Sequence, residues 1–512
     1  QGGGSVIIKQ GTYTAVTGLT APANSFVHGE PGTILAGALV SNNSAMLLLG
    51  AGSVVTGLTF NMTGNSGKPA YGIRVNGANT RVEANRFLYP AGANDQAGVD
   101  VQGTSGFPPP VGGIVIADNQ FGTIASPFTC LGGSGASGAL VLRGKLQDLR
   151  VNRNSFTLAA GGRAGISFDS SASVSSALVS ENSIQGFSFA GVELAGPGSN
   201  LDVRGNSFSG FTGAAVVIGQ GATASAYANL KITDNSMVGY PGTGWGIRAL
   251  GMSIIEGMVI TGNQMGLSAR NMTGLLVDPP NGGGIRIDAP AGAPAPYPLV
   301  QGAIIANNRI EGVSQDGIQL WRAAKSIIQG NRITAGAGDL NNVVGIHLDR
   351  TAGSTQTVNS DVSILDNSIE DFAAGIQVGN AGGGGNPNLR IAGNLLIGPP
   401  GVAANAGEMT VGYAGSPANR RRAMQLEVNS APIDVTHNRI RDYREGIVIS
   451  IAVANLVRVA GNTFSVSTPN ITDNAGALAL GVVTQYRNNA GIVGWLLRSP
   501  GYCYWTPAVP SV

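Results

Sequence analysis

The run VVGIHLDRTAG at residues 343–353 places His347 two positions before Asp349, in a segment that otherwise has the character of a buried strand. The chain contains only three histidines among its 512 residues, so a histidine close to a carboxylate is unusual in this sequence. Residues two apart in a strand lie on the same face, which brings an imidazole and a carboxylate together. Such a pair can donate and accept protons during the cleavage of a bound substrate.

An internal repeat defines the elements that must position these side chains. A motif of the form aliphatic-x-x-Asn-x-aliphatic or aromatic occurs thirteen times, from VEANRF to VAGNTF, with a mean step of about 31 residues. Its asparagines are Asn85, Asn119, Asn154, Asn182, Asn206, Asn235, Asn263, Asn308, Asn331, Asn367, Asn394, Asn438 and Asn462. Asparagine tolerates left-handed backbone conformations, and its amide can replace missing backbone partners in a turn. We therefore interpret these asparagines as a structural ladder without a chemical role.

A second motif, Gly-aliphatic-x-aliphatic, follows most of these asparagines and appears as GVDVQ, GISFD, GVELA, GIRAL, GIRID, GIQLW, GIHLD, GIQVG and GIVIS. Strict alternation over four or five residues is typical of a strand with one buried face. Short strands separated by Gly and Asn turns, with no amphipathic helix between them, predict an all-β chain whose coils stack on one another. The predicted fold is a single-stranded parallel β-helix, a solenoid of about thirteen or more coils.

The same residues resemble a known superfamily. The N-x-I/F turns, the G-I-x-L strands and the opening GGGSVIIKQGTY are similar to those of the pectate-lyase-like right-handed parallel β-helices, over residues 1–485. The resemblance implies a right-handed solenoid and an activity among lyases, hydrolases, epimerases and phage tailspikes, because the repeats mark the coil and not the reaction. Members usually carry a capping amphipathic helix before the first strand. Its absence predicts a truncated or processed N-terminus, and residues 486–512, which leave the repeat, are expected to cap the other end or dock a partner.

Composition excludes several classes of protein. Charged residues make up 11% of the chain and the formal net charge is +2, which does not suit a nucleic-acid-binding surface. No apolar run is long enough to span a membrane. The low Lys and Glu content favours a secreted, extracellular or virion-surface protein. Three scattered histidines and the distant Cys130 and Cys503 match no metal-ligand spacing, so we predict no metal site.

The repeat alignment places the outward residues of successive strands in two columns. Neighbouring residues in a column are about 4.8 Å apart, the spacing between paired strands. The first column includes Arg248, Arg286, Gln319, His347 and Gln377, and the second includes Asp288, Trp321, Asp349, Gly379 and Glu427. The sequence predicts that Arg286, Asp288, Gln319, Trp321, His347 and Asp349 form one contiguous exposed patch in a groove. A tryptophan between two carboxylates suits a polysaccharide, because the apolar sugar face stacks on the indole and acids flank the glycosidic oxygen.

Carboxylate spacing then points to a reaction. Asp288 and Asp349 lie two coils apart, hence about 9 to 10 Å between backbones, which suits the separation of about 6.5 to 9.5 Å used by inverting glycosidases. The first hypothesis is therefore an inverting endo-glycosidase with Asp349 as general acid and Asp288 orienting water. The same spacing relates Asp349 to Glu427, and the sequence does not separate these pairs. Glu193 with Asp169 is a third pair.

The basic residues support a polysaccharide lyase as the alternative enzyme. Arg248, Arg286, Arg322 and Arg350 belong to the same band, and the loop SPANRRRAM adds Arg420, Arg421 and Arg422. Arginines can neutralise a uronate carboxylate, after which His347 or Arg286 could remove the C5 proton in β-elimination. The resemblance implies Ca²⁺ for some lyases, although no dense acidic cluster is present to hold it. We expect no other cofactor.

A third hypothesis is a non-catalytic glycan-binding adhesin or tailspike shaft. In that case the outward columns would be packing surfaces between the subunits of a homotrimer, and Trp321 would anchor the interface. Turnover of a polysaccharide separates this hypothesis from the two enzymatic ones.

Overall fold

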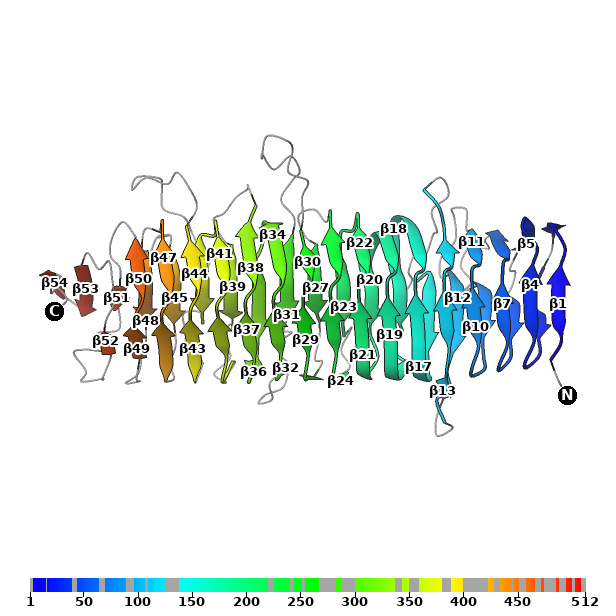
Figure 1. Ribbon diagram of the computed structural model, residues 1–512, viewed down its shortest axis with the longest axis horizontal. Coiled ribbons are helices and arrows are strands. Elements are labelled where there is room, and N and C mark those ends of the chain that lie inside the picture. Colours follow the sequence, from blue (N-terminus) through cyan, green and yellow to red (C-terminus); the bar gives the residue numbers. More distant parts are fainter. Residues whose placement is uncertain are drawn as a thin grey trace. The chain divides into compact units, whose positions relative to one another are not determined.

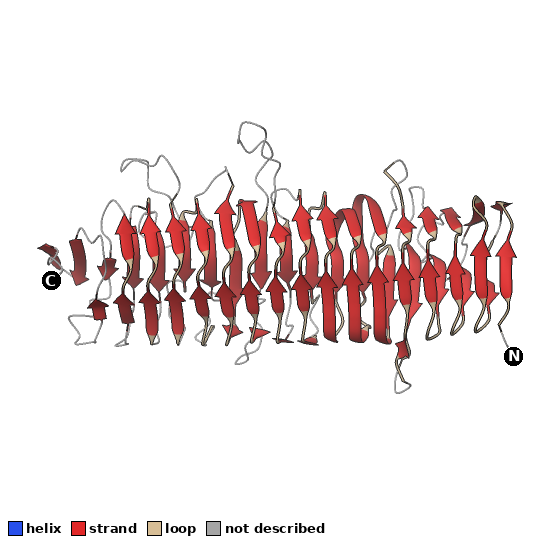
Figure 2. Ribbon diagram, viewed as in Figure 1, coloured by secondary structure: helices blue, strands red, loops and turns tan. Residues whose placement is uncertain are grey.

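The computed structural model describes residues 3–14, 16–38, 44–63, 70–88, 96–105, 109–124, 138–219, 225–239, 244–250, 254–266, 282–287, 300–336, 343–349, 359–379, 388–398, 422–427, 432–443, 445–450, 457–465, 471–473, 485–487, 494–499 and 502–507. Regular structure within these ranges is entirely β-strand (Figure 2). No helix long and apolar enough to cross a membrane occurs there.

The chain divides into two compact units, residues 1–240 with 247–253 and residues 241–246 with 254–512. Within each unit the chain passes through three strand positions per repeat. Strands at the same position in successive repeats pair in parallel, so each unit contains three stacks of strands (Figure 1). We call them stack one, stack two and stack three. Strand β27 (Trp245–Ala249) contributes residues to both units.

The first unit is built from the following strands. Stack one contains β1 (Ser5–Ile8), β4 (Phe26–Gly29), β7 (Val54–Thr56), β10 (Arg81–Glu83), β14 (Val115–Ala117), β17 (Lys145–Asn152), β19 (Ser173–Ser180), β21 (Gly198–Arg204) and β25 (Lys231–Thr233). Stack two contains β2 (Gly11–Tyr13), β5 (Thr33–Ala38), β8 (Thr59–Thr63), β11 (Arg86–Leu88), β15 (Gln120–Phe121), β18 (Ser155–Phe168), β20 (Ser183–Leu194), β22 (Ser207–Ser209) and β26 (Ser236–Val238). Stack three contains β3 (Leu19–Ala21), β6 (Ser44–Leu49), β9 (Ala70–Val75), β12 (Gln96–Gln102), β16 (Leu140–Arg143) and β23 (Ala214–Ile218), and the long strands β18 and β20 also run through it.

The second unit repeats this arrangement. Stack one contains β29 (Val259–Thr261), β33 (Ile304–Ala306), β37 (Ile327–Gln329), β40 (Ser363–Leu365), β43 (Leu389–Ala392), β46 (Ile433–Thr436), β49 (Val457–Ala460) and β52 (Gln485–Arg487). Stack two contains β30 (Gln264–Met265), β34 (Arg309–Val313), β38 (Arg332–Ala335), β41 (Ser368–Glu370), β44 (Leu395–Ile397), β47 (Arg439–Arg441) and β50 (Thr463–Ser465). Stack three contains β31 (Gly283–Ile287), β35 (Ile318–Trp321), β39 (Val344–Asp349), β42 (Ala374–Val378), β45 (Arg422–Glu427), β48 (Glu445–Ser450), β51 (Ile471–Asp473) and β53 (Gly494–Ser499). Short strands β13 (Val111–Gly112), β24 (Ala226–Ala228), β28 (Ile254–Glu256), β32 (Val300–Gln301) and β36 (Ala323–Ala324) pair beside stack one.

The stacks confirm the predicted all-β solenoid of about thirteen or more coils, since stack one alone has nine strands in the first unit and eight in the second. The end of the chain departs from the repeat. Strand β54 (Tyr502–Pro507) pairs with β53 in the antiparallel sense, whereas β53 pairs with β51 in parallel. This departure lies within the predicted segment 486–512, and the boundary at residue 485 stays a prediction.

All thirteen predicted asparagines are buried, with exposed fractions of 0 to 2%. In the first unit the backbone N–H of each donates to Oδ1 of the next at 2.9 to 3.0 Å, from Asn85 to Asn235. In the second unit the same bond runs from Asn263 to Asn462 at 2.9 to 3.1 Å. The ladder satisfies backbone groups at a turn where no strand pairs them, which confirms its structural interpretation.

The motif glycine of stack three is required by close packing. A methyl group on Gly345 would lie 2.2 Å from Cγ2 of Ile369 and 2.6 Å from the carbonyl oxygen of Gly375. A methyl group on Gly317 would lie similarly close to the equivalent atoms of the next coil, 2.3 Å from Cγ2 of Ile333 and 2.6 Å from the carbonyl oxygen of Gly345. Each glycine thus lets the apolar residue of stack two fill the coil interior.

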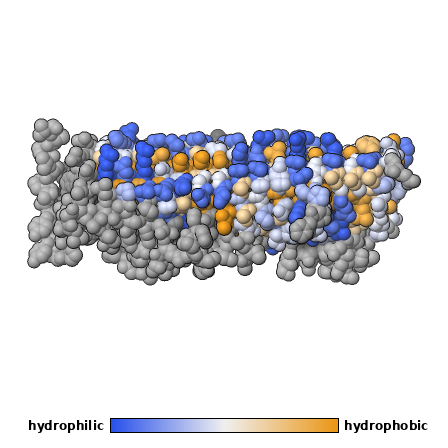
Figure 3. All heavy atoms as spheres, turned by 90° about the horizontal axis from the view of Figure 1, so that it is seen from below, coloured by the Kyte–Doolittle hydropathy of each residue, from blue (hydrophilic) through white to orange (hydrophobic). Residues whose placement is uncertain are grey.

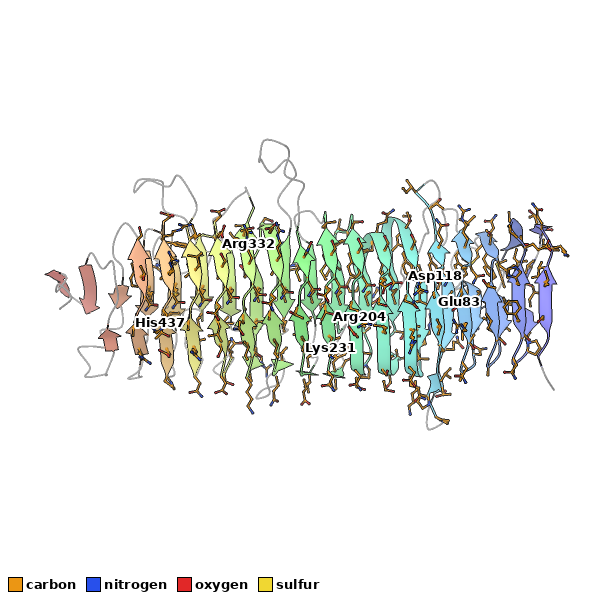
Figure 4. All side chains as sticks on the ribbon, in the orientation of Figure 1. Glu83, Asp118, Arg204, Lys231, Arg332 and His437 are labelled. Carbon is orange, nitrogen blue, oxygen red and sulfur yellow. The ribbon has the colours of Figure 1, made fainter. Side chains whose placement is uncertain are left out.

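The outer surface of stack one is mixed in character. In the second unit Ile304 and Ile327 occupy paired positions and are 42% and 37% exposed. Figure 3 shows hydrophobic side chains grouped among polar ones on the face seen from below. His437 lies in the exposed turn between β46 and β47, with φ of 56° (Figure 4), as the sequence predicts for a surface turn residue.

Candidate functional site

The first outward column exists in stack three of the second unit. Adjacent strands pair Arg286 with Gln319, Gln319 with His347, His347 with Gln377 and Gln377 with Gln425. The predicted order of these side chains is therefore confirmed by the strand register. It follows from the repeat alone, because parallel pairing in register aligns equivalent positions.

The second outward column is described in part. Trp321 of β35 pairs with Asp349 of β39, and Glu427 of β45 pairs with Ser450. The side chains of Asp349 and Glu427 lie outside the described residues, as do Asp288, Arg350, Arg420 and Arg421 in full. Their catalytic and binding roles stay predictions.

The predicted exposure of the patch is wrong for two of its members. Gln319 and His347 are only 8% and 5% exposed, and the next residue in the column, Gln377, is 1% exposed. Arg286 and Trp321 are half-buried. Long side chains stacked at a strand spacing of about 4.8 Å shield one another along a column, a packing effect that position on the outer face does not reveal.

Asp316 is a member of the site that the sequence reasoning missed. It lies in the turn before β35, and its Oδ2 is 2.9 Å from Nδ1 of His347, while its Oδ1 accepts the Val344 N–H at 3.0 Å. The side chains of His347 and Asp316 are 6% and 13% exposed. The contact joins an acid–base group to an orienting carboxylate, the arrangement that proton-transfer chemistry uses.

A shared sequence position explains this contact. Asp316 directly precedes the motif glycine, where many other repeats carry a small or aliphatic residue such as Ala97, Ala190 or Ala374. Where that position holds a larger polar or aromatic residue, its side chain reaches the outer surface of stack three. Such contacts are Arg74 over Tyr71 at 4.6 Å, Arg286 over Trp245 at 5.3 Å, and Glu445 with Arg422 at 2.9 Å. Departure from a small residue before the motif glycine is the signal that could have found Asp316 and Glu445.

Three of the remaining predicted arginines, Arg322, Arg422 and Arg248, lie within the described residues. Arg322 is 9% exposed at a turn with φ of 56°, and burial lowers its pKa. Arg422 pairs with the buried Glu445 and donates to Gln425 at 3.1 Å. Arg248 is half-buried and belongs to the first unit. Arg322 and Arg422 thus occupy separate environments, and the predicted roles of the arginines in substrate binding stay predictions.

Comparison with known proteins concerns the fold of the chain. Residues 280–411 match the family described as a right handed beta helix region. The chain is a right-handed parallel β-helix. The resemblance found in its repeats is confirmed to that extent. No curated protein matches the β-helix.

Three solved structures illustrate what the β-helix is similar to. The Dettilon tailspike protein is 14% identical, with a TM-score of 0.41 over 73% of this chain and 61% of that chain. An alginate lyase in complex with a trisaccharide is 12% identical, with a TM-score of 0.36 over 99% and 86%. A mutant tailspike protein of E. coli bacteriophage HK620 in complex with a pentasaccharide is 11% identical, with a TM-score of 0.47 over 92% and 73%. The β-helix therefore spans less than two thirds of the Dettilon protein.

The first unit of the β-helix carries a separate network of ion pairs on stack three. Asp100 is fully buried and lies 3.0 Å from Arg74 and 3.3 Å from Arg143, and Arg143 also lies 3.9 Å from Asp169. Glu193, 1% exposed, bonds to Ser167 and Arg163 at 2.9 and 3.0 Å. Glu193 and Asp169, the third predicted pair, thus take part in two different ion-pair clusters. The catalytic role of this pair stays a prediction.

Burial raises the pKa of Asp100, while the guanidinium groups of Arg143 and Arg74 act in the opposite sense. A carboxyl group with a raised pKa favours the folded state in its protonated form, so its contribution is lost as pH rises above its unfolded value of about 3.9. We expect the β-helix to lose stability relative to Asp100→Asn as pH rises above about 4, measured as denaturation midpoints at a series of pH values.

Asp118 supplies a control of opposite sign. It is exposed and its pKa is lowered by the hydrogen bond from Arg153. The original chain should therefore gain stability relative to Asp118→Asn as pH rises toward about 4, and should show little further change above that pH. Equal slopes for the two variants would contradict the assignment for Asp100.

No group of three or more His, Cys, Asp or Glu side chains within the described ranges is arranged to hold a metal ion. Cys130 lies outside those ranges, and Cys503 of β54 pairs with Arg498 through the strand register.

Proposed function

We propose that this chain degrades an extracellular polysaccharide on the outer surface of β31, β35, β39 and β42. The observation that carries the proposal is the contact of 2.9 Å between His347 and Asp316, which places an oriented proton-transfer group in the outward column. Gln319 and Gln377 flank His347, and Gln319, the less buried of the two, carries an amide that can bond to a sugar hydroxyl. Trp321 stands two residues after Gln319, half-buried, as a stacking surface for a pyranose.

The His347 contact favours β-elimination on a uronate polymer. Nε2 of His347 is buried in the substrate-free chain, so substrate binding must expose it before it can accept the C5 proton. A double bond then forms between C4 and C5, and the C4–O bond breaks with protonation of the leaving oxygen. A nearby arginine such as Arg286 can balance the uronate carboxylate and stabilise the developing negative charge. Ca²⁺ would supply the same stabilisation if a substrate brought it to the site.

Inverting hydrolysis is the second candidate. It is favoured by the register pairing of Trp321 with Asp349, which sets a carboxylate beside the indole. Nε1 of Trp321 is buried and has no hydrogen-bond partner in the described part of the chain, so it can donate to a sugar hydroxyl only if binding exposes it. In this mechanism Asp349 protonates the glycosidic oxygen, and Asp288 or Glu427 activates water. The protein would be secreted or carried on a virion under either mechanism.

Products distinguish the two reactions. We expect incubation with a panel of acidic and neutral polysaccharides to release oligosaccharides with an unsaturated, ultraviolet-absorbing end if His347 acts by elimination. Hydrolysis would release reducing ends without that absorbance, with inverted anomeric configuration, and would be lost in Asp349→Asn and Asp288→Asn. Binding without turnover on every polymer would favour the adhesin or shaft, and a homotrimer would then be sought by sedimentation.

Trp321→Ala tests the substrate surface under either reaction. We expect this change to weaken oligosaccharide binding by about 1 to 3 kcal/mol, because stacking on an aromatic ring contributes that much at comparable platforms. The measurement is a titration with an inactive variant, so that binding is separated from turnover. Unchanged affinity would place the binding surface elsewhere.

A further inference from the structure

Asp316 is bonded to the coil before it and to the coil after it. Its backbone carbonyl accepts the Gly284 N–H of β31 at 3.1 Å. Its carboxylate accepts the Val344 N–H at 3.0 Å with Oδ1 and meets His347 Nδ1 at 2.9 Å with Oδ2. A side chain held at both oxygens has little freedom to rotate, so it fixes the imidazole plane as well.

We infer that Asp316 is a positioning residue that holds His347 in the Nδ1–H tautomer and raises its proton affinity. The part of the inference that concerns catalysis rests on the proposed function. The part that concerns the tautomer of His347 rests on the geometry alone. An ionised carboxylate only accepts hydrogen bonds, so Nδ1 must carry the hydrogen. The lone pair then lies on Nε2, which becomes the nitrogen that takes a proton from substrate.

Asp316 is the charged side chain placed at contact distance from His347 among the described residues, while the side chain of Asp349, two positions later on the same strand, lies outside them. Gln319 on β35 and Gln377 on β42 occupy the adjacent column positions, and both are uncharged. Arg286 lies two strands away in the same column. A carboxylate at contact distance in a buried site stabilises the imidazolium form, whereas burial alone would disfavour it.

A purely structural contact is the competing explanation. Asp316 could join two coils without serving His347, and its removal would then lower stability only. The two explanations predict different protonation of the His347 ring, which can be measured by spectroscopy without any substrate. Failure of the inference is therefore distinguishable from failure of the proposed function.

Nuclear magnetic resonance of the histidine rings tests the inference. Because the chain has three histidines, the changes His28→Gln and His437→Gln leave the His347 signal alone in the ¹⁵N-labelled chain of 512 residues. We expect the neutral ring to carry hydrogen on Nδ1, and Asp316→Asn to lower the proton affinity of the ring by about 10-fold or more. Hydrogen on Nε2, or equal proton affinity in both proteins, would overturn the inference.

Kinetics supply the second measurement. With a susceptible polymer, Asp316→Asn should move the acidic limb of the kcat profile to lower pH and reduce kcat, with KM nearly unchanged. Asp361→Asn is the matched control, because Asp361 is an exposed carboxylate that bonds to Asn388 on stack one. A pH profile that does not move while stability falls would assign Asp316 a structural role and overturn the inference.

Discussion

Replacing His347 by glutamine is expected to lower the turnover of a susceptible uronate polymer by about 10²- to 10⁴-fold, the usual contribution of a general acid–base group. Glutamine cannot accept and release a proton at neutral pH, yet it can hydrogen-bond to Asp316. It also matches Gln319 and Gln377, which pair with position 347 on either side. The coil should therefore fold normally. The loss should appear in kcat, measured by product absorbance, with oligosaccharide affinity retained.

His437→Gln is the control for this change, since His437 is exposed at a turn of stack one. It should retain full activity. Full activity in His347→Gln, together with inactivity of Asp349→Asn, would reject elimination and support hydrolysis. Retention of turnover in both variants would move the chemistry to another coil.

Replacing Asn331 by alanine is expected to lower the free energy of unfolding by about 2 to 5 kcal/mol, because several buried groups lose their partners at once. The Asn331 amide donates to Ile305 O and to Asn367 Oδ1, each at 2.9 Å. Its Oδ1 accepts the backbone N–H of Asn308 at 3.0 Å. Alanine leaves that N–H and the Ile305 carbonyl buried without partners. Denaturant unfolding monitored by circular dichroism measures the change.

Gln329→Ala provides the comparison, two residues earlier in the same coil. Gln329 is exposed, and its side chain makes one hydrogen bond of 3.3 Å to Asp366. Its replacement should change the unfolding free energy by about 0.5 kcal/mol or less. Similar losses in the two variants would show that the ladder does not stabilise the coil as its geometry implies.

The fold could be predicted from the sequence because each repeat contains residues that indicate its turn, its close packing and its buried face. Asn331 marks a turn and Gly345 marks a close approach. The alternation of Ile346 and Leu348 marks the buried face of a strand. The same alignment gave the pairing of Gln319 with His347 correctly, since register in a parallel stack is inherited from coil to coil.

The candidate site was predicted less completely, for two physical reasons. The burial of His347 depends on how much of its side chain the neighbouring side chains cover. Its position in a column predicts only the face of the strand on which the side chain lies. Asp316 acts from a position before the motif glycine that was not part of either predicted column, although its residue type departs from the small residues common there. Comparing residue types at that position across repeats would have identified both Asp316 and Glu445.

The asparagine ladder also bears on how the chain reaches its folded state. Every ladder bond within a unit joins residues 23 to 45 positions apart, as between Asn308 and Asn331 or Asn263 and Asn308. Each new coil therefore needs only the coil made just before it as a template, and loop closure never spans the whole chain. Folding can advance from coil to coil while the ribosome is still synthesising the later repeats, so chain length adds time to the process without adding a larger entropic barrier.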